Sequence, residues 1–458
     1  MKNVFKFLLI VLASVIVYAG YYIYQAVPII TAYGAKNLCS CVFVAGRNPD
    51  QVITEELSTT LSKLGNYKIN SADSSATGSV FGLFTRKAIY RRGLGCTLVN
   101  GIDEKTLRNQ PFNVAKPIAV DQDTIDWPSG NRTSIKIPSN IDTAVLFKAI
   151  TAAFTEPNPE VRFRTRAVLV VYRDTIIAER YAEGFNASTP LMGWSMTKSL
   201  TNAFVGILAG QNKLNIHAPA PVAGWETDER KNITLDNLMH ASSGLDWNEF
   251  YGGPSDATNM LFKVADAGGY AALSGTKQKP DTEFYYSSGT TNIISKIVRN
   301  AIGENDYHSF PYTELFHKIG MEHTTIEPDP SGTFVGSSFS YAPARDWARF
   351  GLLYLHDGIW NGERILPEGW VKYTTTPAPK ALRGEYGAQW WLNHGAEKNP
   401  SDRTYPDVPT DSFQCEDFEG QYVFVVPGED LVVVRLGLSQ QENFDMNKLV
   451  SEIISAIR

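Results

Sequence analysis

The stretch Gly193-Trp194-Ser195-Met196-Thr197-Lys198-Ser199-Leu200 places a serine three residues before a lysine. The largely apolar run that follows, 201–210, predicts a buried helix beginning at this point. Because residues three apart on a helix share a face, we expect the Lys198 amine beside the Ser195 hydroxyl. A neutral amine there could take the hydroxyl proton, which is the Ser-Lys form of an activated nucleophile.

The spacing alone is a weak signal, since Ser274-Gly275-Thr276-Lys277 also fits S-x-x-K. That second match lies among Gly and Pro residues and predicts a loop. Only the match at Ser195 opens a helix, whose positive N-terminal end favours a developing alkoxide. By spacing alone, a surface serine beside a solvated lysine would be the default interpretation.

Length and composition suit a globular chain. It has 458 residues, 43% of them hydrophobic and 12% aromatic, enough for a sizeable core in several domains or in one large two-lobed unit. The net charge of -6 gives no reason to expect nucleic-acid binding. The seven histidines show no ligand spacing, and no P-loop or H-E-x-x-H motif occurs in the sequence. We therefore expect no metal and no cofactor.

The N-terminus predicts a membrane anchor. Lys2 and Lys6 precede an apolar run over 7–27, about the length of a membrane-spanning helix. The lysines predict a cytoplasmic N-terminus, a single pass through the cell membrane, and the rest of the chain on the outer side. A cleaved signal peptide is the alternative, because Val17-Tyr18-Ala19 would suit a signal peptidase. The run continues through 21–24 without a polar break, which favours an uncleaved anchor over 1–32.

The four cysteines agree with export to an oxidising compartment. Cys39, Cys41 and Cys96 fall in one N-terminal region, and Cys415 lies far along the chain. Cys96 could pair with either Cys39 or Cys41 in a structural disulfide. No C-x-x-C pair or nearby histidine completes a zinc site.

Residues 33–140 form an accessory region without a recognisable catalytic motif. The patterns there predict a helix from Pro49, a small polar loop over 71–79, and strands over 81–90 and 93–98. Residues 117–138 are rich in Pro, Asp, Ser and Asn and predict an extended linker.

Residues 141–458 show the pattern of one catalytic domain. Strand and helix signals occur at its two ends: a helix over 142–154, strands over 166–172, 175–181, 421–426 and 431–436, and a helix over 448–457. Helical patterns fill the middle. The fold class is therefore α/β in the α+β sense: an antiparallel sheet completed by both ends of the domain and flanked by helices, with an inserted helical lobe and an N-terminal transmembrane helix in front.

Tyr286 and Ser288 stand just before a predicted helix over 290–300. A tyrosine there could bring its hydroxyl to Ser195 and Lys198. Beside a lysine ammonium its pKa would fall from the usual value of about 10, so it could act as a general base or relay a proton to the leaving group. Taken alone, a buried tyrosine with a hydrogen-bonded hydroxyl explains the pattern equally well.

Ser195-x-x-Lys198, Tyr286-x-Ser288 and the terminal hairpin that starts at Gly420 occur in a familiar order. In this the catalytic domain resembles the serine β-lactamase and penicillin-binding-protein-like superfamily. The likeness is to its class C-like branch, which includes family VIII-type carboxylesterases and 6-aminohexanoate-dimer hydrolases. Each motif is short, but their combination in this order is specific.

That resemblance implies that Ser195 is the acylated nucleophile and that Lys198 and Tyr286 manage the proton. The Ser195 N–H would supply one half of the oxyanion hole. An N–H on the strand leading into Gly420 would supply the other half. Each such donor typically contributes about 3 kcal/mol to transition-state stabilisation.

Two departures set the chain apart from β-lactamases of this branch, which usually carry Asn two residues after the tyrosine. Ser288 stands at that position, which is more similar to the esterase and amide-hydrolase members. The usual basic triplet is missing before the final hairpin, and Asp417 stands where related hydrolases often have glycine. We name Ser288, Asp417 and Gly420 as candidate substrate-binding residues.

The stretch 411–419 is acidic. It would repel an anionic β-lactam or peptide carboxylate and favour a neutral or cationic ester or amide, unless its acids point to solvent. We therefore expect an exported, membrane-anchored serine hydrolase that cleaves a small-molecule ester or amide through a Ser195 acyl-enzyme. The rival hypothesis, supported by Asp417 and the missing triplet, is a catalytically weak or inactive binding or sensing domain of the cell envelope.

Overall fold

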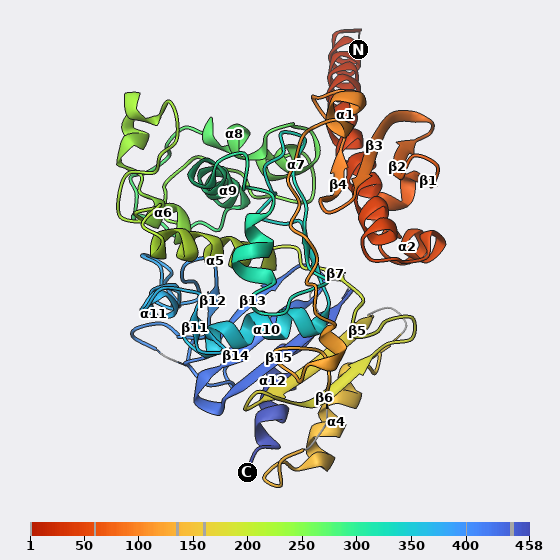
Figure 1. Ribbon diagram of the computed structural model, residues 1–458. Helices are drawn as coiled ribbons and strands as arrows, with labels where there is room; N and C mark the ends of the chain where they lie inside the picture. Colours follow the sequence, from red (N-terminus) through yellow and green to blue (C-terminus); the bar gives the residue numbers. More distant parts are fainter. Residues whose placement is uncertain (1, 59–60, 134–136, 159–161, 400, 440–443) are drawn as a thin grey trace.

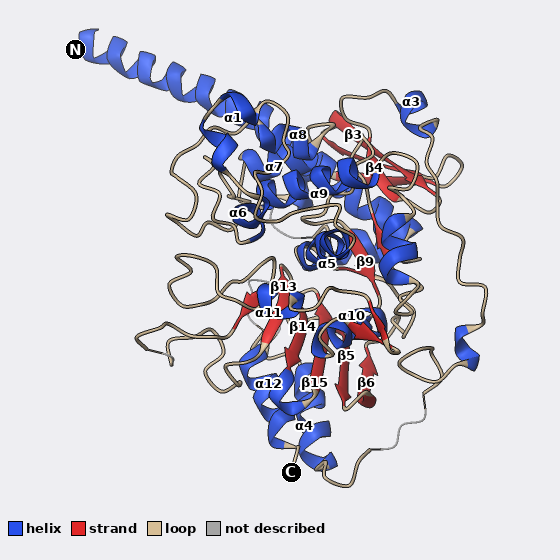
Figure 2. Cartoon of the chain, turned by 60° about the vertical axis from the view of Figure 1, so that its left-hand side comes forward, coloured by secondary structure: helices blue, strands red, loops and turns tan. Residues whose placement is uncertain are grey.

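A long N-terminal helix leads into the rest of the molecule (Figure 1). The computed structural model describes residues 2–58, 61–133, 137–158, 162–399, 401–439 and 444–458. In it α1 runs over 42 residues (Lys2–Phe43) and is long and apolar enough to cross a membrane. Residues 3–24 are exposed and project away from the body, whereas 31–41 are mostly buried (Figure 2). The predicted boundary at residue 32 thus falls inside one continuous helix.

The accessory region packs a four-stranded antiparallel sheet on α1. Its order is β1-β2-β3-β4, with α2 (Pro49–Glu55), β1 (Asn66–Asn70), β2 (Ser75–Val80), β3 (Leu83–Arg91), β4 (Gly95–Leu98) and α3 (Glu104–Arg108) in chain order. The two predicted strands are confirmed. The predicted loop over 71–79 is wrong from residue 75 on, because small residues let β2 approach α1 closely. A Cβ on Gly78 would lie 2.4 Å from the Thr31 carbonyl oxygen.

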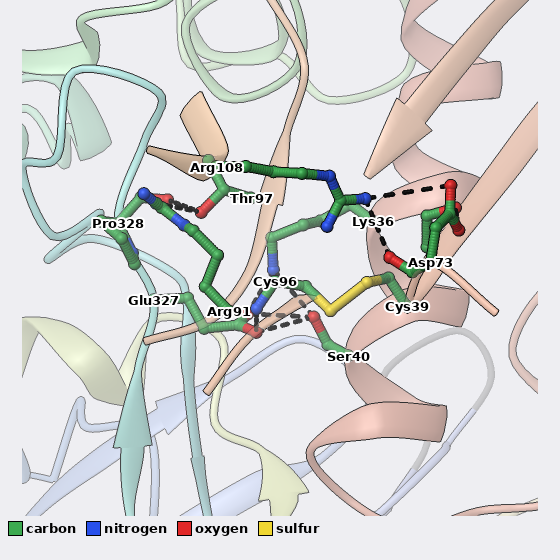
Figure 3. The surroundings of a disulfide bond; sticks show 11 residues. Lys36, Cys39, Ser40, Asp73, Arg91, Cys96, Thr97, Arg108, Glu327 and Pro328 are labelled. Atoms are coloured by element: carbon green, nitrogen blue, oxygen red, sulfur yellow. Dashed lines mark hydrogen bonds and ion pairs between the residues drawn. A yellow bond between two sulfur atoms is a disulfide. The ribbon is translucent and has the colours of Figure 1, made fainter. Parts of the chain in front are cut away.

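A buried cluster around Glu327 joins the accessory region to the catalytic domain (Figure 3). The Glu327 carboxylate accepts hydrogen bonds from the Lys36 amine, from the Ser40 hydroxyl at 2.9 Å and from the Cys96 N–H at 2.5 Å. The side chains of Lys36 and Glu327 are 2% and 0% exposed. Beside the cluster a disulfide joins Cys96 to Cys39, one of the two partners considered above. The ion pair and the disulfide therefore fix the inner half of α1.

The predicted linker, 117–138, runs along the molecule from the accessory region towards the central sheet (Figure 1). Within it, 134–136 lie outside the described residues. Two arginines of α10 (Ala344–Leu355) hold it in place. Arg349 Nε donates to the Pro128 carbonyl and Arg345 Nη1 donates to the Asn131 carbonyl, each at 2.9 Å.

A six-stranded antiparallel sheet forms the centre of the catalytic domain. Its order is β12-β13-β14-β15-β5-β6. The strands are β5 (Thr165–Tyr172), β6 (Thr175–Tyr181), β12 (Trp391–Leu392), β13 (Phe413–Asp417), β14 (Gln421–Val426) and β15 (Leu431–Gly437). β15 pairs with β5, which confirms that both ends of the domain complete one sheet. Alternation along β5 sends Leu169 and Val171 into one core and Val168 and Val170 into the other.

Helices cover both faces of this sheet (Figures 1 and 2). α10 packs on one face, and α4 (Thr143–Ala153), capped by Asp142 as expected, packs with α12 (Met446–Ser455) on the other. The inserted helical lobe contains α5 (Met196–Gly210), α6 (Leu235–Met239), α7 (Asp256–Phe262), α8 (Ala267–Ala272) and α9 (Ser288–Ile302). The remaining α-helix and strands are α11 (Trp370–Thr374), β7 (Leu191–Met192), β8 (Thr325–Ile326), β9 (Ser340–Ala342), β10 (Ile359–Trp360) and β11 (Glu363–Arg364). Since α5 contacts both α9 and β13, it packs between the other helices of the lobe and the sheet.

Replacing Glu327 by alanine is expected to lower the free energy of unfolding by about 3–5 kcal/mol, because Lys36 would stay buried without its counter-charge. Chemical denaturation of the full chain in detergent measures this loss. Glu363→Ala is the control, since Glu363 is 60% exposed and its surface pair with Lys318 contributes less than about 1 kcal/mol. Similar stabilities of the two variants would contradict the role given to Glu327.

Candidate active site

Ser195 stands at the entry to α5, after a strained turn. The preceding Trp194 has a φ of 47°, a region that residues other than glycine seldom adopt. Its indole N–H donates to Glu419 at 3.0 Å, and its ring stacks on Tyr33 of α1 with centroids 6.1 Å apart. These contacts hold the turn in a conformation that it would not prefer alone.

The helix brings Lys198 to Ser195 as the spacing predicts. The Lys198 Nζ donates to the Ser195 Oγ at 2.7 Å, and the two residues are 2% and 8% exposed. The second S-x-x-K match differs, because Ser274 and Lys277 lie in the loop after α8 and Lys277 is exposed. Helix context therefore separates the two matches.

The Lys198 amine is buried among oxygen atoms. It also donates to the Ser288 Oγ and to the Ser337 carbonyl, each at 3.0 Å. Burial lowers the pKa of Lys198 to about 8, against the opposing charges of Glu249 and Asp417, which raise it. A neutral amine is thus accessible near neutral pH, and Ser288, predicted as a substrate-binding residue, contacts the lysine directly.

Tyr286 joins the same group, but not in the protonation state expected. Its ring centre lies 4.7 Å from the Lys198 Nζ, so its aromatic face packs against the amine. The prediction of a lowered pKa is wrong. Burial, and then the charge of Asp417, raise the pKa of Tyr286 well above its usual value. Tyr286 therefore keeps its proton near neutral pH, whereas the neutral form of Lys198 is accessible there.

The Asp417 carboxylate lies where the resemblance places the oxyanion. Its Oδ2 accepts the Ser195 backbone N–H at 2.5 Å. Desolvation raises the pKa of Asp417, whereas Lys198 and hydrogen bonds from the N–H groups of Ser195 and Phe418 lower it. At this position the acidic stretch points into the site and not to solvent. The protein's own carboxylate thus engages the Ser195 N–H, the donor that the resemblance assigns to one half of the oxyanion hole.

Gly420 lies in the β13–β14 turn, where it contacts Arg435 and not Ser195 or Lys198. Its φ is 78°, and its carbonyl accepts a hydrogen bond from Arg435 Nη1 at 2.5 Å. A Cβ at this position would lie 2.1 Å from the same nitrogen. Positive φ and close approach both require glycine here. The residue thus shapes the turn that positions Asp417 and Glu419.

Two residues of the site were not anticipated from the sequence. The Tyr251 hydroxyl is 2.9 Å from the Ser288 Oγ and donates to Glu249 at 2.8 Å. Glu249 also accepts the Ser288 N–H at 2.9 Å. Both lie in the loop before α7, 37 and 39 residues from Ser288. No local spacing links them to Ser288, because only the fold of the helical lobe brings the loop to α9.

A protein-family model described as Beta-lactamase matches residues 148–455. The chain belongs to the β-lactamase family. Residues 1–147 lie outside this match. A relative, the 6-aminohexanoate-dimer hydrolase of Paenarthrobacter ureafaciens, is 24% identical over 299 residues, which cover 59% of this chain and 72% of that protein.

Solved structures agree with the β-lactamase-family fold. A family VIII carboxylesterase superposes with a TM-score of 0.53 at 12% identity, covering 70% of this chain and 98% of that one. A penicillin-binding protein homologue from Caulobacter crescentus superposes with a TM-score of 0.54 at 14% identity, covering 71% and 99%. These likenesses show the fold expected from the sequence motifs.

Lys198→Ala is expected to slow acylation of Ser195 by about 10²–10⁴-fold, the range for removal of a positioned general base. Labelling by a fluorophosphonate probe, followed on a gel over time, measures the rate. Lys277→Ala is the matched control from the second S-x-x-K, and it should label at the wild-type rate. Equal labelling rates for the two variants would exclude Lys198 as the general base.

Proposed function

We propose that this β-lactamase-family chain is an exported, membrane-anchored serine hydrolase that cleaves an ester or amide bond through a Ser195 acyl-enzyme. The observation that carries the proposal is the buried Lys198 amine, 2.7 Å from the Ser195 Oγ. The name of the Paenarthrobacter ureafaciens relative, a 6-aminohexanoate-dimer hydrolase, supports a small-molecule substrate. In the proposed topology α1 stays as an uncleaved anchor, with the catalytic domain on the outer side.

The residues of the site divide the proton transfers among them. As the Ser195 Oγ attacks the substrate carbonyl carbon, the neutral Lys198 amine takes the hydroxyl proton. The bond from that carbon to the leaving alcohol or amine then breaks, while Tyr286 passes the proton from Lys198 to the leaving group. Water then attacks the carbonyl carbon of the ester left on Ser195 and gives a proton to Lys198. The bond from that carbon to the Ser195 Oγ breaks, the Oγ takes the proton back from Lys198, and the carboxylic acid product departs.

Asp417 sets two conditions on this reaction. A substrate anion near Ser195 would meet the carboxylate charge, which favours a neutral or cationic ester or amide. The substrate carbonyl oxygen must also displace the carboxylate from the Ser195 N–H before that donor can stabilise the transition state. The wild-type rate therefore includes the cost of moving Asp417.

The same observation favours a second candidate function. A carboxylate fixed on the Ser195 N–H would suit a catalytically weak or inactive domain that binds or senses a ligand in the cell envelope. The two hypotheses differ in whether Ser195 can be acylated once Asp417 is removed.

Asp417→Ala is expected to speed acylation of Ser195 by roughly 10²-fold, because alanine frees a donor worth about 3 kcal/mol. Asp417→Asn is the matched control, since its amide has the same size and its oxygen can still accept the N–H. Stopped-flow burst kinetics with a p-nitrophenyl ester give both rates.

Equal rates for the wild type and both variants would contradict the need to displace Asp417. A folded protein in which Ser195 is unlabelled in all three forms would favour the binding domain over the hydrolase. Rapid turnover of nitrocefin by the wild type would refute the argument that Asp417 disfavours anionic β-lactams.

The pH dependence of acylation in Asp417→Ala should report Lys198. Because the base is the neutral amine, the rate should rise with pH and level off above the pKa of Lys198, which is about 8 in the wild type. Loss of Asp417, whose charge raises that pKa, should move the midpoint below about 8. A rate that falls as pH rises through this range would exclude Lys198 as the base.

A further inference from the structure

The exposed half of α1 defines the level of a membrane surface. About 22 exposed residues, 3–24, span roughly 33 Å at 1.5 Å per residue, close to the ~30 Å hydrocarbon core of a bilayer. Four exposed tyrosines, Tyr18, Tyr21, Tyr22 and Tyr24, lie at the end nearest the body. Tyrosine is enriched at membrane–water interfaces, so the outer interface falls at about Tyr22 to Tyr24.

The strand β3 runs beside α1 in the same direction (Figure 1). Near the start of β3, the Phe84 carbonyl accepts the Thr31 hydroxyl at 2.8 Å, and the Phe84 ring meets Tyr24 edge-on with centroids 6.1 Å apart. Near its end, Tyr90 stacks on Phe43 with centroids 5.6 Å apart. The start of β3 therefore lies beside the outer part of α1 and its end beside the buried part. The β2–β3 turn precedes this start, so it lies further towards the exposed half of α1, by about 3.3 Å for each residue.

Apolar side chains stand at the interface level on two sides of α1. Phe81 in the β2–β3 turn is 88% exposed, and Leu83, the first residue of β3, is 62% exposed. In the loop before α7, Phe250 is 58% exposed, and Gly253 lies so close to α1 that its Cβ would be 2.5 Å from the Tyr22 hydroxyl. We call Phe81, Leu83 and Phe250 the membrane-facing surface.

Basic groups accompany this surface. Lys263 Nζ donates to the Gln25 Oε1 at 2.7 Å, just below the tyrosines of α1. Burial, and then the charge of Arg86, lower the pKa of Lys263. Cations at this level suit the anionic headgroups of phospholipids.

The loop that carries Phe250 also borders the candidate active site. The next residue, Tyr251, is 52% exposed, and its hydroxyl lies 2.9 Å from the Ser288 Oγ. Ser288 in turn accepts a hydrogen bond from Lys198 at 3.0 Å. The loop before α7 thus contacts both Tyr22 of α1 and the side chains around Ser195.

We propose that the membrane-facing surface inserts into the interface of the bilayer that carries α1, so that the Ser195 site opens at the lipid surface and takes amphiphilic esters or amides held there. The proposal rests on the proposed membrane anchor and serine hydrolase. Its occupant is the lipid bilayer, because the exposed apolar face of α1 continues directly into this surface.

Photo-crosslinking of the full chain tests the docking. The protein is placed in nanodiscs of phosphatidylcholine and phosphatidylglycerol with p-benzoylphenylalanine at one position, and lipid adducts are counted by mass spectrometry after irradiation. Phe81 and Phe250 are the test positions. Phe147 is the matched control, since it is 48% exposed on α4, at the end of the molecule away from the N-terminus (Figures 1 and 2). Tyr18 in α1 reports the anchor itself.

We expect lipid adducts at Phe81 and Phe250 at least ~10-fold above those at Phe147, with strong adducts at Tyr18. Adducts at Tyr18 with Phe81 and Phe250 no higher than Phe147 would overturn the docking and leave the anchor standing. No adducts at Tyr18 would overturn the anchor and the docking with it.

Probe chain length tests the substrate class. In the same nanodiscs, a hexadecyl fluorophosphonate should label Ser195 at least ~10-fold faster than an ethyl fluorophosphonate, because the long chain holds the probe at the lipid surface. Slower labelling by the hexadecyl probe would place the site away from the bilayer and overturn the inference. Labelling by neither probe, in the wild type and in Asp417→Ala, would instead count against the serine hydrolase.

Discussion

Exclusion of water from the Lys198 amine is the constraint on which the site depends. α5 carries this amine between the other helices of the lobe and the central sheet, since both α9 and β13 contact the helix. Burial there lowers the pKa of Lys198 to about 8 and makes a neutral base available beside Ser195. The central sheet and the inserted lobe together exclude water from the Lys198 amine.

Lys198 and Asp417 bias each other towards the unreactive state. The Asp417 charge raises the pKa of Lys198, and the Lys198 charge lowers that of Asp417. A substrate carbonyl that displaces the carboxylate would therefore free the Ser195 N–H and at the same time favour the neutral amine. Binding and activation would be coupled through the movement of one side chain, without any change in the fold.

Local patterns predicted much of this arrangement. Ser195 and Lys198 share a helix face, and the strands around the terminal hairpin alternate or run apolar, so their geometry follows from short-range rules. The direction of the Asp417 side chain could not be predicted in this way, because it depends on how the end of β13 meets the turn at Trp194. Tyr251 and Glu249 reach Ser288 only through the packing of the lobe. Sequence patterns did not predict the strand β2, because its small residues are required by close contact with α1 and have low strand propensity.

Acyl transfer through Ser195 can be observed by peptide mapping with mass spectrometry. The full-length Asp417→Ala protein would be mixed with p-nitrophenyl acetate, quenched in acid during the burst and digested. We predict one added acetyl group on the peptide that contains Ser195, lost in the Ser195→Ala, Asp417→Ala double variant. An acetyl group on Lys198 or elsewhere, with Ser195 unmodified, would contradict catalysis through this serine.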